Sequence, residues 1–181
     1  MTTSHPPLTV RRAREDEWRE TRDLRLAALQ DPAAPVAFLE TYDVAAARPD
    51  EFWQERARGN ATSEAVAAFV AVGADGRWVG TTTGLVEEPG ATDVLGGPVA
   101  QRQVHLVGVF VRPEHRGAGL LGRLFDGAQD WARGLGVERA RLCVHVANPR
   151  AQAAYRKLGF TPSGSRFVLE QGEELELVRA L

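Results

Sequence analysis

A glycine-rich turn in the second half of the chain is suited to bind an anion. It reads His115-Arg116-Gly117-Ala118-Gly119-Leu120-Leu121-Gly122 and lies between an expected strand and an expected helix. The first N–H groups of a helix lack intrahelical acceptors and lie at the positive end of its dipole, so they attract negative groups. Glycine allows close approach to the backbone, and Arg116 and Arg123 add positive charge. The alternative is a tight structural turn whose arginines are solvated.

Residues 117–122 also match Gly-x-Gly-x-x-Gly, the pattern of dinucleotide-binding reductases. That pattern should follow its strand directly, and an acidic residue should end the next strand about 20 residues later. Here residues 112–115 intervene, and the next expected strand ends Leu142-Cys143-Val144-His145-Val146 without an acid. The chain contains neither Gly-Lys-Ser nor Gly-Lys-Thr, which excludes a P-loop. A reductase is therefore the weakest hypothesis.

Two motifs resemble those of the GCN5-related N-acetyltransferases, the GNAT family. The family's first pattern, Gln or Arg followed by x-x-Gly-x and Gly or Ala, lines up with Arg116, Gly119 and position 121. Leu121 replaces the usual small residue, and Gly122 follows it directly. The second pattern, Asn-x-x-Ala-x-x-x-Tyr-x-x-x-Gly-Phe, is matched at Asn148, Ala151, Tyr155, Gly159 and Phe160. Together the motifs cover residues 104–160.

The resemblance implies a site for acetyl-coenzyme A (acetyl-CoA) in a cleft where the fourth and fifth strands splay apart. It implies that the turn holds the pyrophosphate, with Arg116 and Arg123 as charge partners. The turn residues concerned are Gly117, Ala118, Gly119, Leu120, Leu121 and Gly122. The strand backbone at Val109 and Val111 would bind the pantetheine arm and polarise the thioester carbonyl. Asn148 would hydrogen-bond the same arm, a role compatible with capping the helix that starts at Pro149.

Acyl transfer to an amine needs a neutral nucleophile, a polarised carbonyl and a proton for the departing thiolate. Tyr155 occupies the position where the resemblance implies the tyrosine that protonates the coenzyme A sulfur, and an ordinary phenol pKa of about 10 suits an acid. His105 is the expected general base, as the polar member of an otherwise apolar strand face. That face would carry His105, Val107, Val109 and Val111. Many relatives have glutamate there, and an imidazole with an ordinary pKa of about 6.5 can remove the same proton.

Other interpretations of these residues stay open. Tyr155 can be helix packing, and His105 can be a structural residue hydrogen-bonded at a strand end. The alternative bases are His145, Glu40, Asp43, Glu87 and Glu88, and His115 is expected to be structural or near phosphate. The aromatic residues Phe38, Tyr42, Phe52 and Trp53 lie in or after the loop that walls the acceptor site in this family. Core packing is the default for each, and two of them facing the cleft would indicate an acceptor with an apolar or aromatic body.

The pattern of elements indicates an α/β domain. Strands are expected at 8–11, 64–72, 77–86, 104–111, 139–146, 165–170 and 174–179, and helices at 16–29, 49–59, 116–133 and 149–158. Residues 38–43 and 87–102 are expected loops, and the second is long enough to be functional or disordered. Mixed hairpin and crossover connections point to a mixed sheet. With the resemblance, we expect one domain over 1–181, with a mostly antiparallel sheet flanked by helices.

Composition and charge exclude several classes of protein. The 181 residues are 44% hydrophobic and 25% charged, as in a globular domain rather than a disordered chain. A net charge of −2 gives no general attraction to nucleic acid or anionic lipid. Residues 91–181 carry 12 basic and 9 acidic side chains, against 10 and 15 in 1–90, so an anionic ligand is expected on the second half. No apolar run approaches the roughly 20 residues of a membrane span, and residues 1–12 show no secretory signal, so a cytoplasmic location is expected.

Together these observations predict an N-acetyltransferase. It would transfer an acetyl group from acetyl-CoA to a primary amine of a small molecule by direct attack, with His105 as base and Tyr155 as acid. The rival hypothesis is an acyl-CoA-binding module without catalysis, which Leu121 and the alternative bases leave open. No metal is expected, because the single Cys143 cannot build a zinc cluster and is expected to be a buried, inert thiol. Neither nucleic acid nor membrane is an expected partner, and a homodimer is compatible with the sequence.

Overall fold

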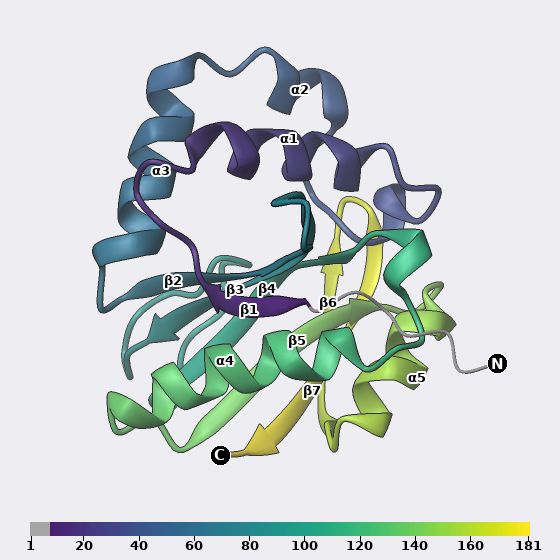
Figure 1. Cartoon of the computed structure of the whole chain (residues 1–181). Helices are drawn as coiled ribbons and strands as arrows, with labels where there is room; N and C mark the ends of the chain where they lie inside the picture. Colours follow the sequence, from purple (N-terminus) through teal and green to yellow (C-terminus); the bar gives the residue numbers. More distant parts are fainter. Residues whose placement is uncertain (1–7) are drawn as a thin grey trace, which may run out of the picture.

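A seven-stranded sheet runs through the computed structural model, which describes residues 8–181 (Figure 1). Its strands lie in the order β1-β2-β3-β4-β5-β7-β6. They are β1 (Thr9–Arg12), β2 (Val66–Val72), β3 (Trp78–Glu87), β4 (Gln103–Val111), β5 (Arg139–His145), β6 (Thr161–Leu169) and β7 (Gly172–Ala180). Within these residues only β4 and β5 pair in parallel. The expected mixed, mostly antiparallel sheet is confirmed.

Within residues 8–181, five α-helices cover the two faces of the sheet (Figure 1). The first three, α1 (Trp18–Leu29), α2 (Tyr42–Ala46) and α3 (Asp50–Thr62), lie on one face, and α4 (Leu120–Gly134) and α5 (Pro149–Lys157) lie on the other. Short 3-10 turns, η1 (Ala34–Val36) and η2 (Pro113–His115), follow α1 and β4. In this part of the chain, no helix has the length and apolar character needed to cross a bilayer. The expectation of no secretory signal involves residues 1–7, which lie outside the described residues.

Each helical layer buries its own part of the apolar core. On the α4 face, Leu124 packs with Leu106 of β4 in one cluster. On the α1 face, Leu24 packs with Phe110 of the same strand in another. The buried residues of α4 recur at helical spacing, so one stripe of this helix faces the sheet. Both faces of β4 are therefore covered, and the strand lies at the centre of the molecule.

The three largest differences from the sequence-based expectations are one additional helix and the starts of two elements. The sequence does not predict α2, because its five residues are too few to show helical periodicity. The helix expected from residue 116 begins at Leu120, because Gly117 and Gly119 have positive φ angles of 80° and 76°, which an α-helix cannot contain. The strand expected from residue 165 begins at Thr161, where it already pairs with β7.

A β-bulge interrupts β4 at Gly108. Gly108 and Val109 together lie opposite Thr82 of β3, so β4 carries one extra residue at this point. The φ of Gly108 is +61°, in the left-handed region that glycine adopts readily. An extra residue reverses the alternation of side chains beyond it. The odd-numbered and even-numbered residues of β4 therefore exchange faces of the sheet at the bulge.

The bulge makes one expectation wrong. His105, Val107, Val109 and Val111 do not share a face. After the bulge, Val109 and Val111 pack in the α4 core, as Leu106 does before it. Phe110 packs in the α1 core instead. His105, which precedes the bulge and alternates with Leu106, therefore lies on the α1 side of the sheet.

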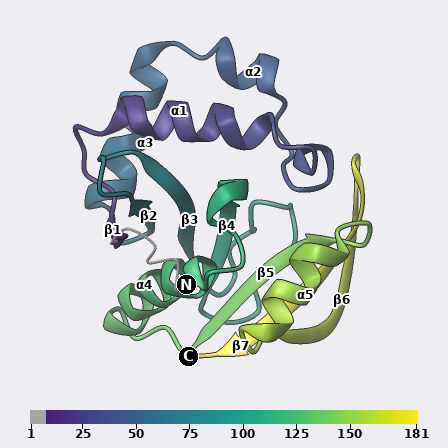
Figure 2. The same ribbon diagram turned by 45° about the vertical axis from the view of Figure 1, so that its right-hand side comes forward.

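The strands β4 and β5 are paired over two residues only. Val104 lies opposite Ala140 and His105 lies opposite Arg141, and the described residues contain no further pair between these strands. Beyond His105 the two strands diverge (Figure 2). Backbone groups of β4 that would otherwise bond to β5 have no strand partner there. The expected splay between the fourth and fifth strands is confirmed.

The long loop between β3 and β4 is held in place by Asp93. One carboxylate oxygen accepts hydrogen bonds from the N–H groups of Leu95 (2.9 Å) and Gly97 (2.8 Å), and the other accepts one from the Arg141 guanidinium (2.6 Å). Burial acts to raise the pKa of Asp93, but the guanidinium and the two N–H groups outweigh it and hold the pKa below its ordinary value. Asp93 thus fixes the loop to β5 as an ionised carboxylate.

We expect Asp93→Asn to lower the free energy of unfolding by about 2 kcal/mol, because Arg141 loses a buried ionic partner. A carboxylate whose pKa is lowered by folding stabilises the fold above its unfolded pKa, about 3.9 for Asp, and ceases to do so as the pH falls through its folded pKa. Chemical denaturation should therefore show the difference from wild type shrinking below about pH 3.9. Asp75→Asn, in the exposed β2–β3 turn, is the control and should change stability by less than about 0.5 kcal/mol. A difference for Asp93→Asn that is independent of pH would contradict the role of its charge.

Candidate active site

A cleft of about 930 Å³ lies along the open edge of β4. One wall comes from β4, the start of α4 and α5, and the opposite wall comes from α1, α3 and residues 31–40. The lining includes most residues singled out in the sequence: His105, Val109, Val111, Arg116, Gly117, Gly119, Leu120, Leu121, Gly122, Asn148 and Tyr155. Ala118 and Arg123 are not part of the lining formed by the described residues.

The start of α4 presents a row of free N–H groups to this cleft. Among residues 8–181, no backbone or side-chain acceptor receives the N–H groups of residues 117–122. Gly119 is the N-cap of the 15-residue helix, and no side chain caps it. A Cβ on Gly117 or Gly119 would have no atom within 4 Å, so the space beside the backbone of the turn is open at these two residues. This arrangement is suited to bind an anion such as a phosphate.

Leu121, which departs from the family pattern, packs partly on the α4 core and also lines the cleft. The next residue has a packing role: a Cβ on Gly122 would lie 3.2 Å from Cδ2 of Leu158. Gly122 therefore allows α4 to approach the end of α5 closely.

The two arginines near the turn have partners inside the protein. Arg116 donates hydrogen bonds to the carbonyl of Val111 (2.8 Å) and to the carboxylate of Asp31 (2.5 Å). Arg123 donates one to the carbonyl of Leu8 (2.6 Å), which directs its guanidinium toward β1 rather than the cleft. Arg116 thus ties the end of β4 to the segment after α1.

Two of the residues that the sequence singles out, Tyr155 of α5 and the N-cap of this helix, Asn148, line the cleft. Asn148 caps the helix, because its Oδ1 accepts a hydrogen bond from the N–H of Ala151 (3.2 Å). Tyr155 is 9% exposed, and its ring stacks on Phe125 with the centroids 5.8 Å apart. Burial raises the pKa of the Tyr155 hydroxyl, and the nearby negative charge of Glu174 raises it further. The hydroxyl therefore keeps its proton at neutral pH, as a proton donor must.

His105 is almost completely buried and is held by a carboxylate. Its Nδ1 lies 2.9 Å from Oε1 of Glu87. Burial acts to raise the pKa of Glu87, but hydrogen bonds from His105 and Gln103 and the charge of Arg141 lower it below its ordinary value. An ionised carboxylate only accepts hydrogen bonds, so Nδ1 carries a hydrogen, and in the neutral imidazole Nε2 then has the lone pair. Among the described residues, Nε2 has no hydrogen-bond partner, and His105 lines the cleft.

Glu87 belongs to a buried network of charged side chains. Its second oxygen accepts hydrogen bonds from Gln103 (2.8 Å) and Arg141 (3.1 Å). Arg141 is 2% exposed and also forms ion pairs with Asp93 (2.6 Å) and Glu176 (2.9 Å). These contacts fix both oxygens of Glu87, so the carboxylate has one orientation toward the imidazole.

The alternative bases are engaged elsewhere. His145 accepts a backbone N–H at Nδ1 (3.0 Å), so its Nε2 carries the hydrogen and donates to the carbonyl of Gln171 (2.9 Å), which leaves no free lone pair. Glu40 and Glu88 form ion pairs with arginines. Asp43 is exposed on α2 and does not line the cleft.

The family model for "Acetyltransferase (GNAT) family" matches residues 10–160 of this sequence. The chain belongs to the GNAT family. This confirms the family that the two motifs resemble and the acyltransferase class that it implies. The match extends well beyond the motifs, into the first 100 residues, where the sequence shows no motif of its own.

The individual GNAT relatives are distant. A protein of Bacillus subtilis (strain 168), named as a candidate ribosomal protein bS18-alanine N-acetyltransferase, is 30% identical over 78 residues, or 42% of this chain. The chain spans about half, 52%, of that relative's length. A GNAT acetyltransferase structure from Streptococcus pneumoniae has a TM-score of 0.76 at 17% identity, covering 97% of this chain and 100% of that one. A phosphinothricin acetyltransferase from Sinorhizobium meliloti, solved with acetyl-CoA, has a TM-score of 0.70 at 19% identity, covering 96% and 88%.

Several charged residues of this GNAT cleft are not revealed by the motifs. Arg150 and Lys157 of α5 are exposed and line the cleft. Their spacing of seven residues, about two helical turns, is the signal in the sequence that both side chains lie on one face of the helix. Glu174 of β7 also lines the cleft, and burial raises its pKa.

His115 has a buried Nδ1 without a partner in the described structure. Cys143 lines the cleft and is half-buried, so the expectation of a buried thiol is wrong. Burial still raises the pKa of this thiol to about 11, so it stays protonated at neutral pH.

The aromatic residues of the first interhelical segment mostly form core. Trp53 is fully buried, and Phe52 packs beside it between the helices. Tyr42 does not line the cleft, whereas Phe38 does. One of these four aromatic side chains lines the cleft, whereas two were needed to indicate an acceptor with an apolar or aromatic body. These residues therefore give no such indication.

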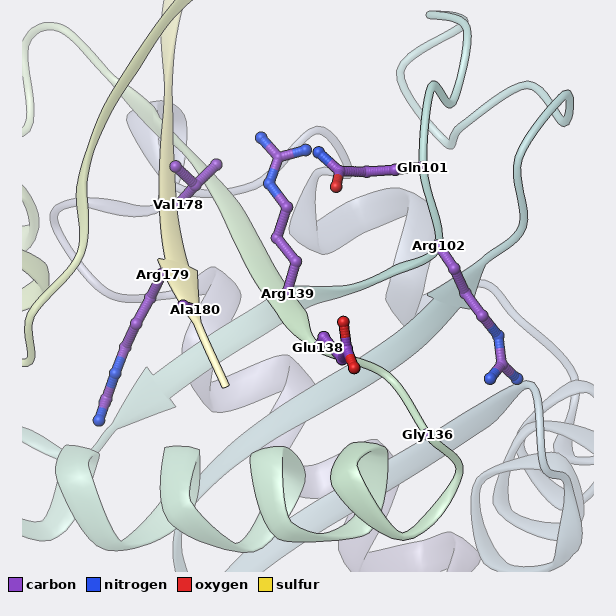
Figure 3. Close-up of a pocket in the computed structure, with 8 residues that line it drawn as sticks. All are labelled: Gln101, Arg102, Gly136, Glu138, Arg139, Val178, Arg179 and Ala180. Atoms are coloured by element: carbon purple, nitrogen blue, oxygen red, sulfur yellow. The ribbon is translucent and has the colours of Figure 1, made fainter.

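A second hollow of about 520 Å³ lies where β5 begins and β7 ends (Figure 3). Its three arginines, Arg102, Arg139 and Arg179, point in different directions. Each donates a hydrogen bond to another group of the protein. Because the charges diverge and are already paired, this hollow lacks the convergent polar groups of a ligand site.

Proposed function

We propose that this GNAT protein transfers an acetyl group from acetyl-CoA to the primary amine of a small molecule, in the cytoplasm. The observation that carries the proposal is one cleft that joins a row of free N–H groups, an open strand edge, an unpaired imidazole nitrogen and a buried phenol. Acetyl transfer needs these parts: an anion site for the donor, a strand that holds it, a base and an acid.

In this proposal the donor lies between the start of α4 and the open edge of β4. The free N–H groups of residues 117–122 hold the pyrophosphate. The backbone of Val109 and Val111 and the amide of Asn148 contact the pantetheine arm. Arg150 and Lys157 are exposed in the cleft, so they supply positive charge that Arg123, held at β1, does not.

His105 is the proposed base. Nε2 takes a proton from the acceptor's ammonium group, because its lone pair is free and Nδ1–H is held by Glu87. The negative charge of Glu87 then stabilises the imidazolium that forms. The amine, now neutral, is able to attack the thioester carbonyl. Glu87 is a positioning residue in this scheme, since it acts through His105.

Tyr155 is the proposed acid. Attack of the amine puts negative charge on the carbonyl oxygen, and unpaired N–H groups of β4 near the bulge stabilise that charge. When the tetrahedral intermediate collapses, the C–S bond breaks and the sulfur leaves with its electron pair. The Tyr155 hydroxyl donates a proton to this thiolate, and solvent restores the phenol. The products are the N-acetylated amine and coenzyme A.

The experiment that tests acetyl transfer is release of free thiol from acetyl-CoA in the presence of a panel of amines, with the N-acetylated product identified by mass spectrometry. Catalysis gives thiol and product in equal amounts. An acyl-CoA-binding module without catalysis would bind acetyl-CoA and release no thiol with any amine.

Gly119→Glu should abolish acetyl-CoA binding measured by calorimetry, because it puts a carboxylate where the pyrophosphate must lie. Wild-type binding should also weaken with added salt. Arg123→Gln is the matched control and should change the affinity less than about twofold, since its guanidinium is engaged at β1. Unchanged affinity in folded Gly119→Glu would show that the donor binds elsewhere.

Tyr155→Phe should lower kcat roughly 10²-fold while the Kd for acetyl-CoA stays within about threefold, because only the donated proton is lost and the ring still stacks on Phe125. Single-turnover measurements ensure that the chemical step is observed. A wild-type rate in that step would mean that water or another group protonates the sulfur.

His105→Gln should cut kcat/KM roughly 10²-fold and flatten the acidic limb of its pH profile, because protonated Nε2 is unable to accept the proton. Glu87→Gln should lower the rate less, since the base remains but loses its ionised partner. Thermal denaturation controls for folding. If His105→Gln lowers the melting temperature but leaves kcat/KM and the acidic limb of its pH profile unchanged, His105 is structural and the base lies elsewhere.

A further inference from the structure

Near Glu40, the helical wall of the cleft carries more guanidinium groups than carboxylates. The other carboxylate of this wall that lines the cleft, Asp31, is paired with Arg116. Arg25 of α1 and Arg56 of α3 both line the cleft, together with Glu40 from the intervening segment. Glu40 is the single carboxylate in this group, and it is already bound. Arg25 donates to it through Nε (3.3 Å) and Nη2 (3.2 Å), and Arg48 lies 3.6 Å away.

Arg56 is the guanidinium without a partner. Within residues 8–181, it forms no hydrogen bond or ion pair, although its side chain is exposed to the cleft. The positive charges of Arg25 and Arg48 act on it in the same direction as burial, and together they lower its pKa against the attraction of Glu40. Arg25 and Arg48 therefore share the Glu40 carboxylate, whereas Arg56 lines the cleft without a partner among the described residues.

This charge lies on the same side of the sheet as the proposed base. His105 and Leu85 are cross-strand partners, so their side chains share a face, and that is the face covered by α1 and α3. Both residues line the cleft with Arg56. The apolar side chains of Phe38, Leu39 and Leu95 also line the cleft.

The carboxylate of Glu174 lies on the β7 wall, and within the described chain it has no ion pair. Glu174 is thus a carboxylate without an ion pair to any of residues 8–181, in a cleft that is lined by Arg25 and Arg56 on the helical wall and by Arg116, Arg150 and Lys157 near the proposed donor site.

We infer that the acceptor is a small amino acid-like molecule, a primary amine that also carries a carboxylate, with Arg56 as the residue that binds this group. The inference rests on the proposed acetyl transfer and names its substrate class. The guanidinium fork matches a carboxylate, and binding it there leaves the ammonium for the part of the cleft with Glu174 and His105. A dication such as a diamine would place a second positive charge beside Arg25 and Arg56, which is unfavourable.

The test uses matched amines with wild-type protein and acetyl-CoA. Each pair consists of an amino acid, whose amino and carboxylate groups are separated by one to five carbons, and the carboxamide of the same amino acid. The carboxamide keeps the amine but lacks the negative charge. Diaminopentane represents the dications. At least one acid should be acetylated with a kcat/KM about tenfold or more above that of its carboxamide, and diaminopentane should be a poor substrate.

Arg56→Gln should raise KM for the preferred acid about 10- to 100-fold with little change in kcat, and should leave the carboxamide unaffected. Arg56→Lys should retain part of the preference, because it keeps the charge without the fork. Arg58→Gln is the control on the same helix, since Arg58 pairs with Glu15 at the surface and does not line the cleft. Thermal denaturation verifies that each variant is folded.

The outcomes separate the two proposals. Carboxamides or diaminopentane acetylated as well as the acids, or equal effects of Arg56→Gln on acids and carboxamides, would overturn the substrate class while acetyl transfer stands. If acetyl-CoA binds and no amine is acetylated, acetyl transfer to these amines fails. Calorimetry of the same acids with coenzyme A-bound protein then tests the proposed carboxylate site at Arg56. Binding that is lost in Arg56→Gln supports this site, and absence of binding to the wild-type protein overturns it.

Discussion

The parallel pairing of β4 with β5 ends after two residue pairs, and the position of the candidate site follows from that. A continuous pair would satisfy the backbone of β4 along its length and leave no room for a ligand between the strands. The last pair consists of His105 and Arg141, so the proposed base lies where the strands part. Beyond it, the open edge of β4 leads to the start of α4, where the free N–H groups lie. The positions proposed for the donor and for the base therefore both follow from one break in strand pairing.

Strands that separate need other contacts to hold the two halves of the sheet together. Arg141 supplies several of them, because it pairs with Glu87 of β3, Asp93 of the following loop and Glu176 of β7. A buried guanidinium deprived of such partners would cost several kcal/mol, so each partner is held firmly. The side chain that orients His105 is thus held by the same residue that anchors the loop and β7. A substitution in this network is expected to affect both stability and the geometry of the base.

The donor half of the site was predictable because its signals are local. The glycine turn and the α5 motif each lie within one short segment, and helix and turn geometry place their residues without knowledge of the rest of the fold. The sequence did not reveal the side-chain direction of Arg123, because that depends on β1, more than 100 residues away in the chain. It also failed to predict that Gly108 reverses the alternation of β4, because an isolated glycine in a strand does not specify a bulge by itself.

The acceptor half was less predictable because its residues come from distant segments. Glu87 and His105 are brought together by the register of β3 and β4 across a long loop, which no local pattern determines. Arg25 and Arg56 lie on different helices whose packing sets their separation. Arg141 is a charged residue within the otherwise apolar middle of β5. Because alternate residues of a strand share a face, this arginine was a signal that one face of β5 is polar. The motifs therefore identified the family and pointed to the donor, whereas the proposal for the acceptor class required the tertiary structure.

The charge of the buried network bears on the direction of proton transfer. Glu87, Asp93 and Glu176 are three carboxylates, and their cationic partners are two guanidiniums, Arg141 and Arg139. With a neutral imidazole the group therefore carries one net negative charge, which is costly in a low-dielectric interior. In the proposed scheme His105 accepts a proton from the ammonium of the acceptor, and this makes the group neutral by formal charge. The same step makes the amine nucleophilic before the carbonyl is attacked, and the imidazolium then forms beside the carboxylate of Glu87.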